Sequence, residues 1–252
     1  MSGVEADLCV VVGATGAVGS AVVGRLVRRG QRVLAVARSA QALAALAQAH
    51  PSVTVCGADI ADDSAIDAIS STLDSPVRMA VFAAGLPVRG SVTAIPPSDL
   101  AVAANVKLGG LLRLVRAVDP WLRQSSRIVC FAGSLGLEPR PTEAAPGAIN
   151  AGVFNLMRQL GDVYGPRGVT THTVSPGPTD TPRLRRIAAN VAQERGIDEA
   201  QAWAEYAANT SLRRLPTVDE VAWAVEWLLD PQADVLHGSV LALDAGGHRG
   251  IH

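Results

Sequence analysis

The stretch Cys9-Val10-Val11-Val12-Gly13-Ala14-Thr15-Gly16-Ala17-Val18-Gly19 determines the fold that we expect for the whole chain. An apolar, valine-rich run ends in glycines at Gly-x-x-Gly-x-x-Gly spacing, and an apolar helical pattern follows from Ser20 to Arg29. A continuous apolar run is typical of a strand buried on both faces of a parallel sheet. The stretch therefore predicts a strand, a tight turn and a helix in immediate succession.

The three glycines of this stretch have different expected roles. Gly13 permits the turn, Gly16 lets the backbone approach a pyrophosphate, and Gly19 lets the helix pack closely on the strand. The first turn of the helix offers unpaired N–H groups and the positive end of its dipole to a phosphate. The alternative is a structural turn without a ligand, but the strand before it and the helix after it favour a nucleotide site. The expected contacts come from Gly13, Thr15, Gly16, Ala17, Val18 and Gly19.

The composition fits one globular domain over residues 1–252, since 48% of the residues are hydrophobic and 18% are charged. A net charge of −1 argues against nucleic acid or an anionic membrane as the main partner. No apolar run reaches transmembrane length and no leader pattern is present, so a cytoplasmic location is the expectation. Cys9, Cys56 and Cys130 each lie in an apolar run, which indicates core residues and neither disulfides nor metal ligands.

Strand-like and helix-like segments alternate along the whole chain. This order predicts a doubly wound parallel α/β sheet of the Rossmann type, with helices on both faces and ligands at the carboxyl ends of the strands. A polar, arginine-rich helical insert at about 181–214 is expected to cover the substrate. The further strands are expected at 31–37, 53–56, 79–83, 127–131, 169–174 and 239–243, and the helices at 40–49, 61–72, 98–118, 147–164 and 217–229.

The residues after the second and third strands suggest which dinucleotide binds. Arg38 stands where NAD-binding folds carry an acidic residue, and a guanidinium suits a 2′-phosphate, so NADP(H) is favoured over NAD(H). The alternative for Arg38 is a solvated residue at a helix start. Asp59 either accepts from an adenine amine or caps the next helix. Further cofactor contacts are expected from Ser39, Ile60, Ala83, Ala84 and Gly85.

Several segments together resemble the short-chain dehydrogenase/reductase family over nearly the whole chain. Segment 82–85 (Phe-Ala-Ala-Gly) resembles the family's Asn-Asn-Ala-Gly, with both asparagines replaced. Segment 127–134 is similar to the strand that carries the catalytic serine, and 165–169 and 174–182 match the family's following segments closely. The resemblance implies a nicotinamide cofactor, contacts to it from Asn150, Pro176, Gly177 and Thr179, and a homodimer or homotetramer built through the helices at 98–118 and 147–164.

The family's catalytic Tyr-x-x-x-Lys pair has no counterpart here. Counting back from Gly165 without gaps places Pro146 at the tyrosine position and Asn150 at the lysine position. In the family the tyrosine exchanges a proton with the substrate oxygen, and the lysine lowers the tyrosine's pKa and holds the nicotinamide ribose. Proline has no proton to give, although an asparagine amide can still bond a ribose hydroxyl. The chain has two tyrosines, Tyr164 and Tyr206, and both lie elsewhere in the sequence.

The candidate catalytic residues are Asn105, Ser134 and Glu143. Glu143, or Glu138 in the same loop, could donate a proton from an apolar pocket, the alternative being a solvated carboxylate. Ser134 either holds a substrate oxygen or is a turn residue, and Asn105 either orients a water or braces its helix. No metal site is expected, because none of the histidines has ligand spacing, and His248 and His252 are expected to be tail residues.

Three functions are compatible with this pattern. The first is an oxidoreductase that uses NADP(H) on a small carbonyl or hydroxyl substrate with an unusual proton donor. The second is a cyclase, isomerase or dehydratase in the same cleft, with the dinucleotide structural or absent. The third is a catalytically inactive subunit that stabilises a relative. Hydride transfer to a product separates the first function from the second.

Overall fold

Seven parallel strands form one central sheet in the order β3-β2-β1-β4-β5-β6-β7. The computed structural model describes residues 8–86, 88 and 90–250. The strand order reverses between β1 and β4, which confirms the doubly wound topology and opens a crevice at the carboxyl ends of these two strands. The strands are β1 (Leu8–Val12), β2 (Arg32–Ala37), β3 (Val53–Gly57), β4 (Val77–Phe82), β5 (Leu122–Phe131), β6 (Thr170–Pro176) and β7 (Val240–Leu243).

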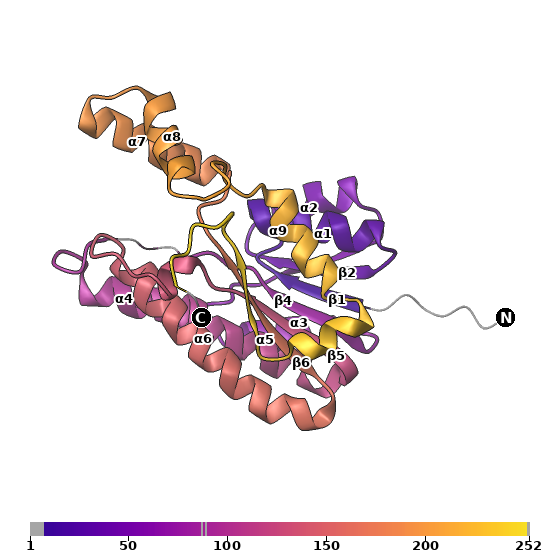
Figure 1. Ribbon diagram of the computed structural model, residues 1–252. Helices are drawn as coiled ribbons and strands as arrows, with labels where there is room; N and C mark the ends of the chain where they lie inside the picture. The colour runs from indigo at the N-terminus through magenta and orange to yellow at the C-terminus, as the bar shows by residue number, and fades with distance from the viewer. Residues whose placement is uncertain (1–7, 87, 89, 251–252) are drawn as a thin grey trace.

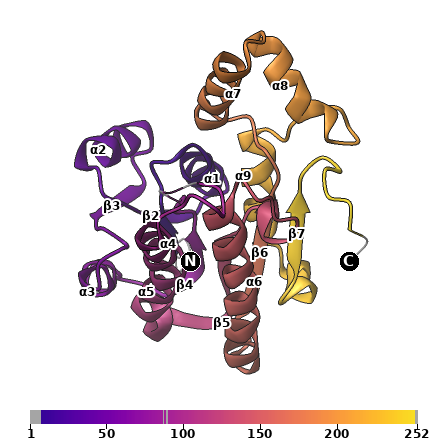
Figure 2. The same cartoon turned by 90° about the vertical axis from the view of Figure 1, so that its left-hand side faces the viewer.

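Helices cover both faces of the sheet (Figures 1 and 2). Along β1, Val10 packs into the core beneath the α5–α6 face, and Val11 packs into the core beneath the α1–α9 face. Both faces are therefore dry, as the continuous apolar run predicts. One face is covered by α1 (Ala17–Arg28), α2 (Ala40–Ala49) and α9 (Val218–Trp227), and the other by α3 (Ser64–Ser70), α5 (Gly110–Val118) and α6 (Ala144–Tyr164). The three cysteines are free and buried, as expected for core residues.

Two helices differ from their expected bounds. The expected single helix at 98–118 consists of α4 (Pro97–Ala104), a π-helical segment η1 (Asn105–Gly109) and α5. Helix α6 begins at Ala144, three residues earlier than expected, and contains Pro146 in its first turn. Proline is tolerated there because N–H groups of the first turn have no partner within the helix. The expected start of this helix at residue 147 was therefore wrong.

The remaining bounds differ by smaller amounts. Helix α3 is shorter than the expected 61–72, and β5 begins at Leu122 where 127 was expected. Thr217 and Glu220 form a capping box at the start of α9. The 3₁₀ segments are η2 (Asp119–Trp121), η3 (Ser134–Gly136), η4 (Gly165–Arg167) and η5 (Pro231–Leu236).

The expected insert consists of two helices that pack on each other, α7 (Pro182–Arg195) and α8 (Glu199–Ala208). They project beyond the carboxyl ends of the strands (Figure 1, orange). The side chain of Thr181 caps α7, and Gly196 ends it in the left-handed conformation. In the described part of the chain, no helix has both the length and the apolar character required to span a bilayer.

Candidate functional site

The glycine turn after β1 brings three backbone segments into close contact. Gly13 has φ +81°, and a Cβ atom on it would lie 2.7 Å from the backbone nitrogen of Ala84. A Cβ atom on Gly19 would lie 2.1 Å from the carbonyl oxygen of Gly13. The turn and the close packing of helix on strand therefore both require glycine, as the sequence predicts.

A cavity of about 240 Å³ opens beside this turn. Gly16 occupies the N-cap position of α1 with no side-chain cap, so the first N–H groups of this helix remain available to an anion. A Cβ atom on Gly16 would meet only the Gly13 carbonyl oxygen, at 3.4 Å. These observations fit the diphosphate of a dinucleotide. Of the expected cofactor residues, the cavity is lined by Gly13, Thr15, Gly16, Arg38, Asp59, Ile60, Ala83, Ala84 and Gly85.

Arg38 and Asp59 face each other at the rim of this cavity. Their charged groups lie 3.9 Å apart, and the Arg38 side chain is 78% exposed. A pair this exposed gains little free energy, so the guanidinium is free to contact a bound anion. Asp59 accepts a hydrogen bond from the N–H of Ala61 and does not cap α3, whose N-cap position is Asp63.

Eight further expected cofactor residues do not line this cavity. Ser39 caps α2 by accepting a hydrogen bond from the N–H of Ala42. Pro176 and Gly177 follow β6 at the same sheet edge, and the Thr179 hydroxyl donates to the Gly177 carbonyl at 3.0 Å. The others are Ala17, Val18 and Gly19 in the first turn of α1, and Asn150 in α6.

The only lysine of the chain lies beneath the first cavity. Lys107 is buried in η1, and its ammonium donates to the carbonyl of Ala84, a lining residue, at 2.8 Å. Burial lowers the pKa of Lys107, because desolvation disfavours its charged form. The π-helical turn carries this side chain inward, a feature that no sequence period reveals.

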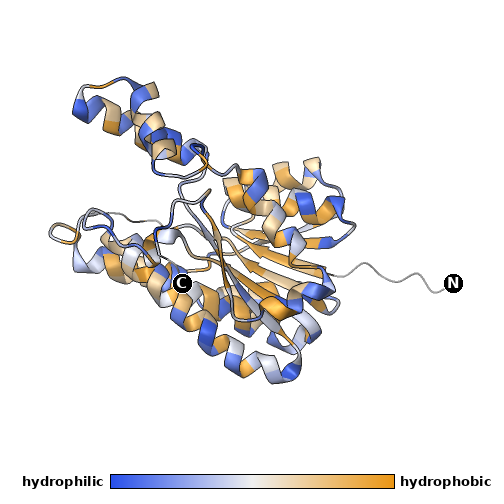
Figure 3. Cartoon of the chain, in the orientation of Figure 1, coloured by the Kyte–Doolittle hydropathy of each residue, from blue (hydrophilic) through white to orange (hydrophobic). Residues whose placement is uncertain are grey.

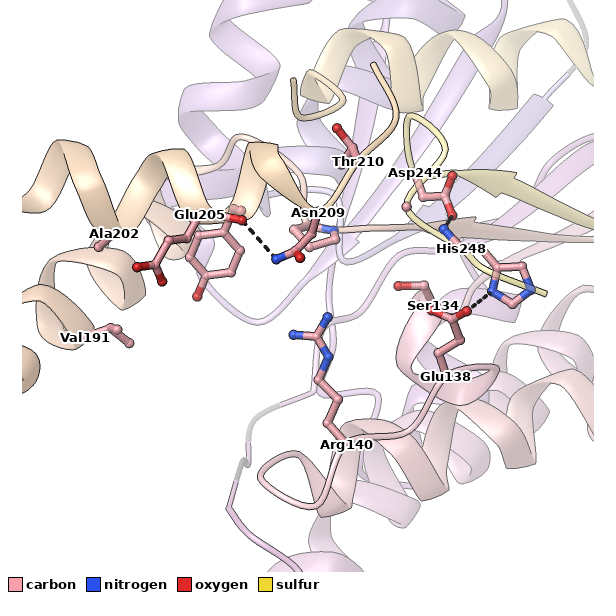
Figure 4. A pocket seen from close by; sticks show the side chains of 13 residues that line it. Ser134, Glu138, Arg140, Val191, Ala202, Glu205, Asn209, Thr210, Asp244 and His248 are labelled. Carbon is pink, nitrogen blue, oxygen red and sulfur yellow. Dashed lines mark hydrogen bonds and ion pairs between the residues drawn. The ribbon is translucent and has the colours of Figure 1, made fainter. Parts of the chain in front are cut away.

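A second cavity, of about 230 Å³, lies where β5, β6 and β7 end and faces α7 and α8 (Figure 4). Ser134, one of the candidate catalytic residues, lines it. Tyr206 of α8 also lines this cavity. The sequence did not predict this position, because Tyr206 is far from Ser134 along the chain. The cavity wall also includes Glu138, Arg140, Glu205, Asn209, Asp244 and His248.

Glu138 contacts the C-terminal segment in this cavity. One oxygen of its carboxylate lies 3.1 Å from Nδ1 of His248 and accepts a hydrogen bond of 2.6 Å from the N–H of Arg249. The N–H of His248 donates to Asp244 at 2.8 Å. His248 is therefore part of the cavity wall, which corrects its assignment as a tail residue. His252 lies outside the described residues.

The Pro146 and Asn150 positions lie one helical turn apart on α6, and both are buried. The amide nitrogen of Asn150 would lie 3.4 Å from a Cβ atom on Gly133, at the end of β5. Tyr164 lies at the far end of α6, next to Arg167 and Asp119. Burial raises the pKa of Tyr164 to about 12. No tyrosine therefore lies beside Asn150 along this helix.

The other two candidate catalytic residues lie away from Ser134's cavity. Asn105 donates to the carbonyl of Ala61 and accepts from the guanidinium of Arg113, each at 2.9 Å, which supports the bracing alternative. Glu143 occupies the N-cap position of α6 and lines a separate groove.

Within residues 8–86, 88 and 90–250, no group of three or more His, Cys, Asp or Glu residues could hold a metal ion.

This chain is similar to known proteins over nearly its whole length. The family model described as enoyl-(acyl carrier protein) reductase matches residues 13–248. Galactitol 2-dehydrogenase from Rhizobium johnstonii is 27% identical over 96% of this chain and 95% of its own.

Two solved structures superpose closely. A short-chain oxidoreductase from Pseudomonas aeruginosa, described as containing an atypical catalytic centre, is 27% identical over 97% of this chain and 98% of its own, with a TM-score of 0.86. L-sorbose reductase from Gluconobacter frateurii, complexed with NADPH and L-sorbose, has a TM-score of 0.90 and covers 99% of each chain. It is 18% identical, so this likeness concerns the fold.

Proposed function

Because the chain belongs to the short-chain dehydrogenase/reductase family, we propose that it is an oxidoreductase that uses NADP(H) on a small carbonyl or hydroxyl substrate. The observation that carries this proposal is the first cavity, where the uncapped α1 terminus and Arg38 line one space. A diphosphate suits the first and a 2′-phosphate suits the second.

The residues around the cofactor and the substrate have different proposed roles. When bound, NADP(H) would supply or accept the hydride. The N–H groups of Ala17 and Val18 would hold its diphosphate, Arg38 its 2′-phosphate, and the amide of Asn150 a ribose hydroxyl. Ser134 would donate a hydrogen bond to the substrate oxygen in the second cavity.

Glu138 is the proton donor of this proposal. It shares the second cavity with Ser134, whereas Glu143 lines the separate groove. The contacts from His248 and Arg249 fix one oxygen of the Glu138 carboxyl group. A carboxyl held in this way can transfer a proton to an alkoxide that forms beside Ser134.

The experiment that tests the proposal is titration of the purified protein with NADPH and NADH by calorimetry. We expect micromolar binding of NADPH and weaker binding of NADH. Oxidation of NADPH is then measured with a panel of small ketones and diones. Failure to bind either dinucleotide would contradict the proposal.

A second candidate is a non-redox reaction in the same cleft, such as an isomerisation or dehydration. Pro146 and Asn150 at the usual tyrosine and lysine positions favour it. Product analysis with NADPH deuterated at its transferable position separates the two candidates. Deuterium in the product supports the redox reaction, and product formed without loss of NADPH supports the alternative.

We also propose that the chain forms a homodimer or homotetramer. Val102 on α4 is 50% exposed and Val163 on α6 is 64% exposed, which leaves apolar surface on the helices that the family uses for assembly. Sedimentation of the purified protein measures the association state. A monomer at micromolar concentration would contradict this part of the proposal.

A further inference from the structure

We propose that Arg140 binds the anionic group of an amphipathic organic acid, whose apolar part lies in the groove between α4 and the start of α6. This inference names the substrate class of the site proposed above. As a statement about the reaction it rests on that function, but the binding event itself does not require the cofactor.

Arg140 lies where two cavities meet. It lines the second cavity together with Ser134, and it also lines the groove together with Glu143. Figure 4 shows its guanidinium rising from the loop before α6 into the second cavity, toward Asn209. A ligand held by Arg140 can therefore reach both the polar strand ends and the groove.

The positive charge of Arg140 is not compensated by its neighbours. Among the described residues, the side chain of Arg140 has no hydrogen bond or ion pair, and only its backbone carbonyl accepts a bond, from the N–H of Glu143. The carboxylates that line the same cavity are engaged elsewhere. Glu205 pairs with both terminal nitrogens of Arg195, at 2.5 and 2.9 Å. Asp244 accepts from two backbone N–H groups, and Glu138 is held by the C-terminal segment.

A guanidinium without a carboxylate partner suits a planar or tetrahedral oxyanion, because its N–H groups form a fixed fork. Among the described residues, none of the insert's arginines lines this cavity. Arg185 pairs with Asp180, and Arg214 pairs with Glu220. Arg140 is thus the free cation of this cavity within the described part of the chain.

The groove supplies the apolar half of the site. Its volume is about 730 Å³, and its walls are mainly apolar, with Val92, Ile95, Leu100, Pro139 and Ala148 among them. Among the described residues that line the groove, Arg140 supplies the positive charge. The anionic group therefore belongs at the Arg140 end and the apolar body among the aliphatic side chains.

The proposed occupant of the groove is a small molecule, because Arg140 lines both the groove and the cavity at the strand ends, where the family's chemistry takes place. A ligand site that combines apolar walls with a few polar groups is typical of small-molecule pockets. A second copy of the chain lying in the groove is an outcome that the experiment separates from this one.

The test uses three probes that share one apolar body: 4-phenylbutyrate, 4-phenylbutyl phosphate and the neutral 4-phenyl-1-butanol. Their binding to the protein without cofactor is measured by calorimetry and NMR. We expect at least one of the two anions to bind tenfold or more tightly than the alcohol. The carboxylate and the phosphate compete directly, so their ratio identifies which oxyanion the site prefers.

Arg140→Gln is expected to reduce the affinity of the preferred anion to that of the alcohol. The matched control is Arg186→Gln on α7, which removes the same charge from an exposed residue outside both cavities and should leave binding unchanged. Equal binding of acid and alcohol, absence of binding by either anion, or an unaffected Arg140→Gln variant would overturn the inference.

A second variant tests the groove. Ala148→Leu places a larger side chain on an exposed groove position of α6 and is expected to weaken 4-phenylbutyrate at least fivefold. If it changes the sedimentation coefficient instead, the groove is an interface between copies and the inference fails. Binding of the acid without binding of NADPH would leave this inference standing while the proposed function fails.

Discussion

The carboxylate of Glu138 and the imidazole of His248 lie 3.1 Å apart, and this contact joins the loop after β5 to the segment after β7. Both residues line the cavity that also holds Ser134. The C-terminal segment thus completes the wall of the proposed substrate cavity. The charged or titratable groups around the pair are Asp244, Arg140, Glu205 and Tyr206.

Glu138→Gln is expected to lower kcat/KM for ketone reduction by about 10² to 10⁴, the usual contribution of a general acid. The assay is NADPH oxidation with the best ketone of the panel. Tyr206→Phe is the matched control, because it removes the phenol hydroxyl of the same cavity, which is a second possible proton donor. A large loss in Tyr206→Phe with none in Glu138→Gln would assign the proton to the tyrosine.

His248→Gln is expected to lower kcat about tenfold with little change in KM, because the imidazole acts by positioning Glu138. The double variant with Glu138→Gln should be no slower than Glu138→Gln alone, since coupled residues are not additive. Additive losses would show that His248 acts independently of Glu138.

Arg38→Asp is expected to weaken NADPH by ten- to a hundredfold and to improve NADH relative to it, because a charge-assisted bond to the 2′-phosphate is lost. Asp59 lies 3.9 Å from the guanidinium, so the new carboxylate would also face a like charge. Arg38→Gln removes the guanidinium without adding a negative charge. Its loss of NADPH affinity therefore measures the missing bond to the 2′-phosphate without repulsion from Asp59. An unchanged ratio of the two affinities would remove the assignment of Arg38 to the 2′-phosphate.

The double variant Pro146→Tyr, Asn150→Lys is expected to gain weak reduction of a simple ketone over the wild type. Pro146 lies in the first turn of α6, where a tyrosine fits the helix equally well. Each single variant serves as a control, because the two side chains act as a unit. A double variant that melts normally, binds NADPH and shows no gain would mean that this helix face does not meet the substrate.

The fold and the first cavity could be predicted from the sequence because their signals are local. The valine run and the glycines of 10–19 specify a strand, a turn and a helix within a few residues, and the structure confirms all three. The Thr217–Glu220 capping box is equally local.

The second cavity could not be predicted because its walls come from distant parts of the chain. The contact between Glu138 and His248 exists only once β7 has paired with β6, and Tyr206 reaches the cavity only through the path of α7 and α8. The π-helical turn that contains the buried Lys107 packs on α6 and leaves no periodic signal in the sequence.

His172 is the basis of a prediction about acid stability. It is fully buried in β6, with Nε2 2.8 Å from the hydroxyl of Thr170. Burial, with a smaller contribution from the nearby Arg127 guanidinium, lowers its pKa from 6.5 to about 4. His237 acts in the same direction, and Asp234 opposes it.

A histidine whose pKa is lower in the folded state binds fewer protons folded than unfolded between pH 6.5 and 4. The stability that the neutral side chain contributes is therefore fully present above about pH 6.5 and is lost as the pH falls toward 4. The loss amounts to about 3 kcal/mol when the two pKa values are converted to free energy. Urea unfolding at a series of pH values should show this decline in the wild type. In His172→Gln the decline should be smaller by about that amount, even though the variant starts from a lower stability at pH 7. Parallel curves for the two proteins would mean that protonation of His172 is not what weakens the fold in acid.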